Sequence, residues 1–341
     1  MQNINSPLAT AQKVQFLRQP ASYDDELVDG TGRVDVRETH MSWVFLTERY
    51  VYKLKKPVRY EFLDFSTLSA RYQDCQAELQ LNRRLAPQVY LDVVPLMVNP
   101  SGQLQLGGAG ELVDWLVKML RLSADAMLDA AIKKGTIEGK DLIRVVQQLV
   151  HFYRTLPPVN LSAADYLLRL KSDLQTTLQS LTLDANGLPG DSSSYLITEL
   201  LAFLQAETDI FDSRIGQGKI VEGHGDLRPE HICLRPEVAI IDCLEFNQSL
   251  RVLDCADELA FLALECERLG AAGVGNQLLK FYCRAAQNPP PERLIRFYKA
   301  YRACLRAKLA LWHMKEPGRL EASDWFERAR TYLHLAEKLL P

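Results

Sequence analysis

The sequence predicts an α+β protein made of two parts. Residues 1–120 combine β-rich runs with one long helical stretch, whereas helical periodicity dominates residues 121–341. A short β-like island at 221–246 interrupts the helical part. At roughly 100–200 residues per domain, a chain of 341 residues is long enough for two domains. We therefore expect one domain at 1–120 and a second, mostly helical one at 121–341 that contains the island.

The elements of the first part follow in order along the chain. A short helix is predicted at 7–18, and a hairpin is predicted from WVFL at 43–46 and YVYKLK at 50–55. A helix should run from about Ser66 to Leu85. Two strands are expected around an Asn-Pro-Ser-Gly turn at 99–102, and the apolar run 112–120 leads out of this part.

Composition and charge disfavour several classes of protein. Hydrophobic residues make up 47% and charged residues 24% of the chain, as is usual for folded proteins in water. The formal net charge of -3 provides no field that attracts nucleic acid. No apolar run approaches the ~20 residues of a membrane span, and the N-terminal residues lack the apolar stretch of a secretion signal. With seven cysteines and no C-x-x-C pair, we expect a cytoplasmic protein with reduced thiols and neither nucleic-acid nor membrane partners.

The island carries the residues with the clearest chemistry. It reads VEGHGDLRPEHICLRPEVAIIDCLEF, with predicted strands at 232–234 and 238–241. Asp226 precedes the first strand, Asp242 follows the second, and His231 lies between them. Phosphoryl transfer needs one carboxylate near the attacking hydroxyl and further ligands that hold a divalent metal against the phosphates. The island therefore indicates a phosphoryl-transfer site.

The chain resembles a known family at these positions. His224-Gly225-Asp226-Leu227 followed by Asp242 is similar to the catalytic hairpin of the aminoglycoside phosphotransferase family, which includes choline-kinase-like enzymes. Its uncharacterised bacterial members carry ETHxSWVFL, YKLKKP, HGDL and DCxEF stretches, found here at 38–46, 52–57, 224–227 and 242–246. The resemblance spans roughly residues 36–120 and 220–310. It implies a bilobal protein-kinase-like fold, with a small nucleotide-binding lobe and a larger helical lobe.

The resemblance assigns Asp226 as the catalytic base and Asp242 as the principal Mg²⁺ ligand. Position 231 departs from the pattern, because His231 stands where the typical kinase has a metal-binding Asn. Mg²⁺ prefers oxygen ligands, whereas imidazole suits transition metals. Three roles stay open for His231: it could bind metal, it could favour Mn²⁺ over Mg²⁺, or it could only hydrogen-bond Asp226.

A kinase site also needs a strand lysine that pairs with a helix glutamate. Lys53 is the candidate and Lys55, on the same strand face, is its rival. Alternatively Lys53, Lys55 and Lys56 are all solvated on an edge strand. Glu78 falls on a partly apolar, inward stripe of its helix, where an unpaired carboxylate would be costly. We therefore expect a Lys53–Glu78 ion pair, and the resemblance implies that Lys53 reaches the ATP phosphates.

Further positions follow from the resemblance alone. Family members often carry a serine-bearing turn in place of a glycine-rich loop, which makes Ser42 a candidate phosphate contact. Segment 114–119 corresponds to the hinge between the lobes, where backbone groups of residues such as Val117 and Met119 bind adenine. Glu258 either braces the backbone of the catalytic loop or belongs to an ordinary acidic helix start.

Uneven charge bears on the acceptor. Residues 280–341 hold 13 basic and 6 acidic side chains, and Lys299, Arg302 and Arg306 form one helical stripe. The stripe either is a solvated face that pairs with acidic residues or borders the acceptor cleft, as the resemblance implies. In the second case Arg302 and Arg306 suit an anionic acceptor, such as a sugar acid or a phosphorylated molecule, better than a polycationic aminoglycoside.

We predict an enzyme that transfers a phosphoryl group from ATP to a hydroxyl of a small molecule, with Mg²⁺ or Mn²⁺ as the assisting metal. The first alternative, motivated by His231, is a nucleotide-binding regulatory pseudokinase with little or no catalysis. The second is nucleotidyl transfer to a protein. Neither the acceptor nor the oligomeric state follows from the sequence.

Overall fold

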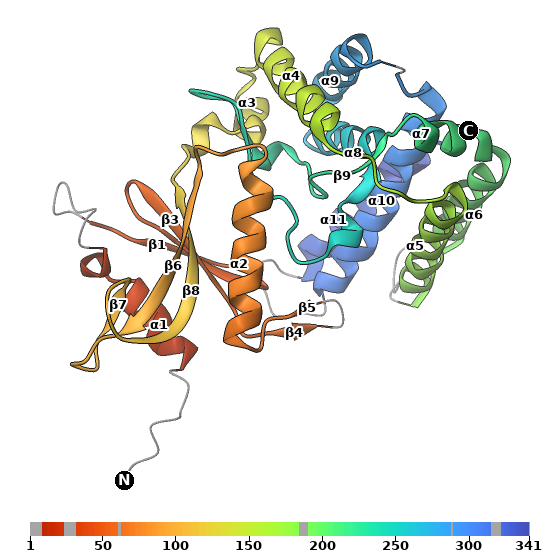
Figure 1. Cartoon of the computed structure of the whole chain (residues 1–341). Helices are drawn as coiled ribbons and strands as arrows, with labels where there is room; N and C mark the ends of the chain where they lie inside the picture. The colour runs from red at the N-terminus through yellow and green to blue at the C-terminus, as the bar shows by residue number, and fades with distance from the viewer. Residues whose placement is uncertain are drawn as a thin grey trace. The chain divides into compact units, whose positions relative to one another are not determined.

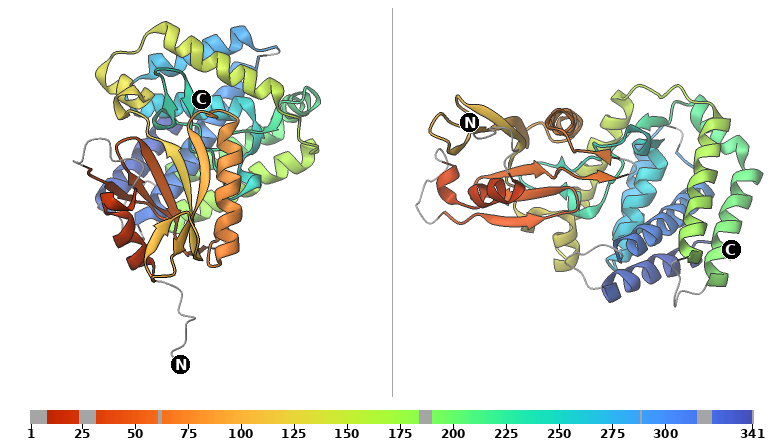
Figure 2. Two further views of the ribbon diagram at one scale, coloured as in Figure 1. Left: turned by 60° about the vertical axis from the view of Figure 1, so that its left-hand side comes forward. Right: turned by 90° about the horizontal axis from the view of Figure 1, so that it is seen from below.

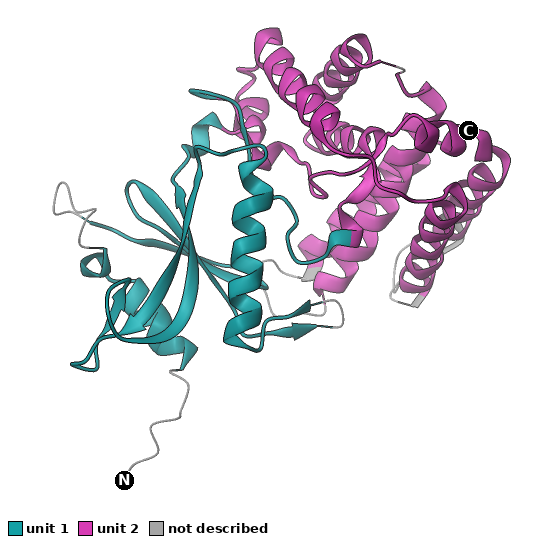
Figure 3. Ribbon diagram, viewed as in Figure 1, with its two compact units in different colours: residues 1–126, 235–248 teal, residues 127–234, 249–341 magenta. Residues whose placement is uncertain are grey.

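A computed structural model describes residues 9–23, 32–60, 63–183, 190–287, 289–314 and 322–340. The chain divides into two compact units, which Figure 3 distinguishes by colour. Unit 1 comprises residues 1–126 and 235–248, and unit 2 comprises residues 127–234 and 249–341. Unit 1 thus extends slightly beyond residue 120 and takes up 235–248, a segment that the sequence assigned to the second domain.

Unit 1 is built on a six-stranded antiparallel sheet with the order β1-β2-β3-β8-β6-β7 (Figure 1). Its strands are β1 (Asp35–Glu38), β2 (Ser42–Leu46), β3 (Tyr50–Lys55), β6 (Tyr90–Val98), β7 (Leu104–Leu106) and β8 (Glu111–Leu120). The short strands β4 (Arg59–Tyr60) and β5 (Leu63–Asp64) pair with each other, and β11 (Ala239–Ile240) also belongs to this unit. The predicted hairpin of β2 and β3 is confirmed. Because β3 lies inside the sheet, the interpretation of its lysines as solvated residues of an edge strand is wrong.

Two helices cover opposite faces of this sheet (Figure 2). α1 (Thr10–Leu17) packs through Val14 and Leu17 against the face that carries Leu54. Successive side chains of a strand point to opposite faces. Lys53 and Lys55 therefore point to the other face, which α2 (Leu68–Arg83) covers.

The segment predicted as the hinge is a strand inside the sheet. β8 is hydrogen-bonded to β3 on one side and to β6 on the other. Asp114 is buried, and its carboxylate lies 2.6 Å from Lys13 Nζ and 2.8 Å from Arg71 Nε. The chain stays in unit 1 as far as Ala126. The predicted hinge segment 114–119 therefore lies within unit 1, where strand pairing and a buried ion-pair cluster fix it, and not at the boundary between the two units.

Unit 2 is mostly helical. Its helices are α3 (Leu128–Lys134), α4 (Gly139–Thr155), α5 (Ala163–Leu183), α6 (Gly190–Ala206), α7 (Thr208–Gly216), α8 (Cys255–Arg268), α9 (Ala272–Ala285), α10 (Glu292–Met314) and α11 (Ala322–Glu337). The strands β9 (Ile220–Glu222) and β12 (Val252–Asp254) pair antiparallel just before α8, and β10 (Ile232–Cys233) follows the His-Gly-Asp loop. The mixed composition of unit 1 and the helical composition of unit 2 confirm the predicted α+β class.

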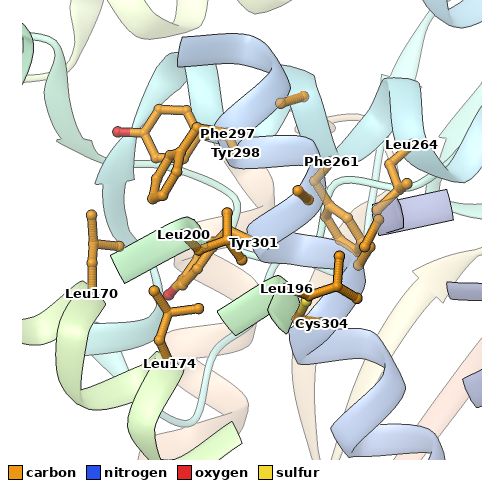
Figure 4. Close-up of a cluster of buried hydrophobic side chains, with 14 of the residues drawn as sticks. Leu170, Leu174, Leu196, Leu200, Phe261, Leu264, Phe297, Tyr298, Tyr301 and Cys304 are labelled. Carbon is orange, nitrogen blue, oxygen red and sulfur yellow. The ribbon is translucent and has the colours of Figure 1, made fainter. Parts of the chain in front are cut away.

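The core of unit 2 forms where α5, α6, α8 and α10 meet. Figure 4 shows side chains that these helices contribute, among them Leu170, Leu200, Phe261 and Tyr298. Each large apolar side chain that is removed from water contributes roughly 1.5–3 kcal/mol, so this cluster holds the four helices together. All seven cysteines are free thiols. No helix in the described part of the chain is both long and apolar enough to cross a membrane.

Candidate active site

Two lysines of β3 and a glutamate of α2 form a buried ion-pair network in unit 1. Lys53 Nζ lies 2.8 Å from Glu78 Oε1, and Lys55 Nζ lies 2.5 Å from Glu78 Oε2. Glu78 is fully buried and Lys55 is 1% exposed. The predicted Lys53–Glu78 pair is present. The expectation that Glu78 would pair with Lys53 rather than with Lys55 is wrong, because one oxygen of its carboxylate contacts each lysine.

Lys55 is enclosed by carboxylates. Besides Glu78, its ammonium group contacts Glu245 Oε1 and lies 2.8 Å from Asp74 Oδ2. The three carboxylates place oxygens within 4.8 Å of one another, a spacing that would also suit a metal ion. The Lys55 ammonium contacts all three, so it takes the place that such a cation would occupy. Asp74 lies one turn before Glu78 on the inner face of α2, which explains why both reach the same lysine.

Asp242 stands beside this network in an unusual backbone conformation. Its φ of 60° is the only positive φ of a non-glycine residue among the described residues. Its backbone N–H donates to the Tyr90 hydroxyl at 3.1 Å, and the next N–H, of Cys243, donates to Asn82 Oδ1 at 2.8 Å. The left-handed conformation costs a non-glycine residue about 1–2 kcal/mol, and these bonds offset that cost. The Asp242 side chain is 47% exposed, and its Oδ1 lies 3.3 Å from Lys53 Nζ.

Electrostatics keep the centre of the network charged. Burial tends to lower the pKa of Lys53, but the carboxylates of Glu78, Asp242 and Glu245 outweigh it, and the net shift is upward. Burial tends to raise the pKa of Glu78, but the two lysines outweigh it and lower that pKa. Burial raises the pKa of Glu245 and of Asp74. At neutral pH Lys53 is therefore a cation, and Glu78 is its firmly ionised partner.

The loop 223–231 of unit 2 holds the predicted base and is braced by Glu258. The Gly225 N–H donates to Glu258 Oε1, and the Tyr153 hydroxyl donates to Glu258 Oε2 at 2.7 Å. A Cβ added at Gly223 would lie 2.8 Å from atoms of the Glu258 carboxylate, so a larger residue there would displace the carboxylate that braces the loop. Of the two interpretations of Glu258, these contacts favour the bracing of the loop.

His231 is engaged within the same loop. Its Nδ1 lies 2.9 Å from the backbone oxygen of Asp226, and its Nε2 lies 3.0 Å from Arg228 Nη2. Arginine can only donate, so Nε2 accepts and the proton resides on Nδ1, which donates to Asp226. The lone pair that a metal would need is thus directed at Arg228. Of the three roles left open for His231, this geometry favours a hydrogen bond to Asp226, although the acceptor is the backbone carbonyl.

The Asp226 carboxylate lies at the accessible side of this loop. Its side chain is 24% exposed, and its Oδ2 lies 3.0 Å from Arg228 Nη2. Arg228 therefore links the carboxylate to the His231 ring. The loop thus presents a fixed carboxylate next to a permanent positive charge.

Two of the three cations on the α10 stripe are neutralised inside unit 2. Arg302 donates to both oxygens of Asp257, at 2.7 and 2.6 Å, and Lys299 Nζ lies 2.5 Å from Glu267 Oε1. The interpretation of the stripe as an ion-pairing face therefore holds for these two residues, although both are largely buried rather than solvated. Because Asp257 neutralises Arg302, the charge of Arg302 no longer supports the expected contact with an anionic acceptor. Arg306 differs and is described below.

The remaining predicted nucleotide contacts lie in the sheet of unit 1. Ser42 is the first residue of β2 and is buried. Val117 and Met119 lie in β8, opposite Lys53 and Val51 of β3. Their contacts with a nucleotide stay predictions.

Sequence reasoning missed Glu245, Asp74, Tyr90 and Asn82. One available signal was the alternation of β3, since Lys53 and Lys55 share a face and two buried cations need more than one carboxylate. The contacts of Tyr90 and Asn82 carried no such signal, because each is a single side-chain bond to the backbone of a distant segment.

We compared the sequence with those of known proteins. No protein-family model matches the sequence. Uncharacterised proteins of Mycobacterium tuberculosis and Mycobacterium bovis are 34% identical to this chain over 280 residues, which is 81% of the chain. The chain spans 54% of the length of these curated relatives.

Solved structures are similar over nearly the whole chain. Choline kinase from Cryptosporidium parvum Iowa II has a TM-score of 0.56 at 10% identity, over 97% of this chain and 95% of that one. A thermostable mutant of aminoglycoside phosphotransferase APH(4)-Ia has a TM-score of 0.54 at 11% identity, over 92% and 97%. Choline kinase LicA from Streptococcus pneumoniae has a TM-score of 0.52 at 13% identity, over 96% and 99%.

The chain has the fold of the choline kinases and aminoglycoside phosphotransferases. The resemblance that the His-Gly-Asp and Asp-Cys-Leu-Glu-Phe segments indicated is therefore confirmed at the level of the fold.

Replacing Lys55 by methionine tests the network. The Lys55→Met variant leaves three buried carboxylates around an uncharged side chain, and breaking a buried ion pair in this way costs about 3–5 kcal/mol. We expect urea unfolding at pH 7 to show that the free energy of unfolding of Lys55→Met is lower by about this amount. Lys56→Met is the matched control, because Lys56 pairs with the half-exposed Glu38 and should cost about 1 kcal/mol or less. Equal stabilities of the two variants would contradict the structural role of Lys55.

Proposed function

We propose that the protein is a small-molecule kinase that transfers a phosphoryl group from ATP to a hydroxyl of its acceptor. The observation that carries this proposal is the arrangement in unit 1, where a strained, half-exposed Asp242 stands 3.3 Å from a lysine that is paired with a buried helix glutamate. Asp226, whose carboxylate is held by Arg228 within unit 2, would be the second group that phosphoryl transfer requires. The fold shared with choline kinases and aminoglycoside phosphotransferases supports the same reaction class.

Lys53 would bind the phosphates of ATP. Phosphate oxygens need a fixed cation, and the carboxylates around Lys53 hold it protonated. Glu78 fixes its position through a 2.8 Å contact. Ser42, Val117 and Met119 would complete the nucleotide contacts from the same sheet.

Asp242 would hold the divalent metal. The network contains four carboxylates, from Asp74, Glu78, Asp242 and Glu245, and the two ammonium groups of Lys53 and Lys55. When all six groups are ionised, the network has a net negative charge. This charge suits a divalent cation at Asp242, the most exposed of the four carboxylates. The donor is a carboxylate oxygen, and hard oxygen donors favour Mg²⁺. When bound, the metal would neutralise charge on the phosphates.

Asp226 would orient the acceptor hydroxyl and accept its proton. As the acceptor oxygen forms its bond to the γ-phosphorus, the bond from that phosphorus to the bridging oxygen breaks and ADP leaves. Arg228 lies 3.0 Å from Asp226 Oδ2 and keeps the carboxylate in a fixed orientation.

The pseudokinase alternative rested on His231. His231 donates to the Asp226 backbone and accepts from Arg228. The histidine at this position therefore stabilises the conformation of the loop. Asp226, Asp242, Lys53 and Glu78 are all present. An active enzyme is therefore the better supported proposal.

The Asp226→Asn variant tests the proposed base. Loss of general-base assistance should lower kcat by about 10²–10⁴-fold, while the dissociation constant for ATP changes little. The acceptor for this assay comes from a screen of metabolites for stimulated ATP consumption. Asp209→Asn, which alters an exposed carboxylate of α7, is the control and should retain full turnover. An Asp226→Asn enzyme with wild-type kcat would refute the assignment.

The Asp242→Ala variant tests the proposed metal ligand. We expect ATP binding in the presence of Mg²⁺ to weaken at least tenfold, whereas binding in the presence of a chelator stays unchanged. Isothermal titration with and without Mg²⁺ measures both. Asp92→Ala removes an exposed carboxylate of β6 and should behave like the wild type. Full Mg²⁺ dependence in Asp242→Ala would show that the metal is held elsewhere.

A further inference from the structure

Three arginines from three helices of unit 2 surround Tyr332 of α11. The guanidinium carbons of Arg268 (α8) and Arg306 (α10) lie 6.0 and 5.9 Å from the centre of the Tyr332 ring. Arg328 lies one helical turn before Tyr332 on the same face of α11. We call these three residues the arginine cluster.

The positive charge of the arginine cluster is only partly balanced. Arg268 Nε lies 2.8 Å from Glu265 Oε2, and the Tyr332 hydroxyl donates to Glu265 Oε1 at 2.5 Å. Within the part of the chain that the structure describes, neither Arg306 nor Arg328 has a carboxylate partner. Arg306 Nε is moreover buried without a hydrogen-bond acceptor among those residues. Burial, together with the charges of Arg268 and Arg306, lowers the pKa of Arg328.

Two other cations of α10 contrast with Arg306, because each of them has a carboxylate partner. Arg302, one turn before Arg306, donates to both oxygens of Asp257. Lys299 is paired with Glu267. Buried polar groups in proteins almost always have partners, and the buried Nε of Arg306 carries a desolvation cost without one. An anion that accepts from Arg306, with Arg328 beside it, would offset that cost.

Helix α8 connects the arginine cluster to the loop of Asp226. Glu258 of α8 accepts the Gly225 N–H of that loop, and Glu265 of the same helix binds Arg268. These two glutamates are seven residues apart, hence about 10 Å along the helix. Glu230 of the loop is also close enough to Arg268 for its charge to raise the pKa of that arginine. Arg228 contacts both Glu230 and Asp226, so the segment that carries Asp226 approaches the arginine cluster through Glu230.

We propose that Arg268, Arg306 and Arg328 bind a phosphate monoester group on the acceptor, whose hydroxyl at the other end reaches Asp226. The proposal rests on the proposed kinase function and names the acceptor class of the same site. Guanidinium groups suit this ligand, because their planar donor pairs match the oxygens of a phosphate. Arg306 thereby keeps the anion-binding role that the sequence predicted, and Arg268 and Arg328 take the place of Arg302.

Binding of inorganic phosphate to the full chain without ATP tests the cluster directly. Phosphate should raise the melting temperature relative to sodium chloride of equal ionic strength. The increase, measured relative to the melting temperature of each variant without phosphate, should persist in a Lys53→Ala background, which removes the proposed nucleotide phosphate contact. Arg306→Gln and Arg328→Gln should each weaken phosphate affinity at least tenfold. Arg330→Gln, which removes an exposed arginine of the same helix, should leave it unchanged.

Wild-type phosphate affinity in both Arg306→Gln and Arg328→Gln would overturn the proposal, as would loss of phosphate binding in Lys53→Ala. A second arm compares glucose 6-phosphate with glucose. The phosphorylated sugar should bind at least as tightly as inorganic phosphate, whereas binding of inorganic phosphate alone would indicate an effector site and contradict the acceptor role. Because neither arm involves ATP turnover, a failure of the kinase function would leave these results unaffected.

Discussion

The structure of unit 1 depends on the need to neutralise two buried lysines that share one face of β3. Strand geometry points Lys53 and Lys55 to the same side, and the sheet and α2 remove them from water. Two ammonium groups without partners would be prohibitively costly there. Glu78 offers one oxygen to each, Asp74 serves Lys55 from the preceding turn of α2, and Glu245 completes the set. The last contact explains why a segment far along the chain belongs to this unit.

The same constraint positions the candidate metal ligand. Glu245 is tied to Lys55, and the residues before it are held by α2 and β6. Asn82 of α2 accepts the Cys243 N–H, and Tyr90 of β6 accepts the Asp242 N–H. Asp242 is thereby held in a left-handed conformation, with its carboxylate beside Lys53. A group that is fixed in advance does not have to be ordered when a charged ligand binds. The ion-pair network thus connects the stability of the unit to the chemistry proposed for it.

Sequence patterns predicted the parts that depend on local periodicity. The α+β class, the hairpin of β2 and β3 and the inward position of Glu78 all follow from spacing along one strand or helix. Features that depend on partners distant in sequence were missed or misjudged. Segment 114–119 was predicted as the hinge between the lobes, because spacing does not show that Asp114 is buried with Lys13 and Arg71. Likewise the α10 stripe was visible in the sequence, but its pairing of Arg302 with Asp257 depends on how α8 packs against α10.

The proposed function is the transfer of the terminal phosphoryl group of ATP to a small molecule. Parallel reactions with ATP labelled at the γ- or the α-phosphorus, each with a pool of small hydroxylated metabolites, distinguish it from its alternatives. We expect γ-label to enter a small-molecule product with release of ADP, and α-label to stay in the nucleotide. Transfer of α-label to protein would instead establish nucleotidyl transfer. Absence of label transfer from either position, with ATP still bound, would contradict the account in favour of a regulatory nucleotide-binding protein.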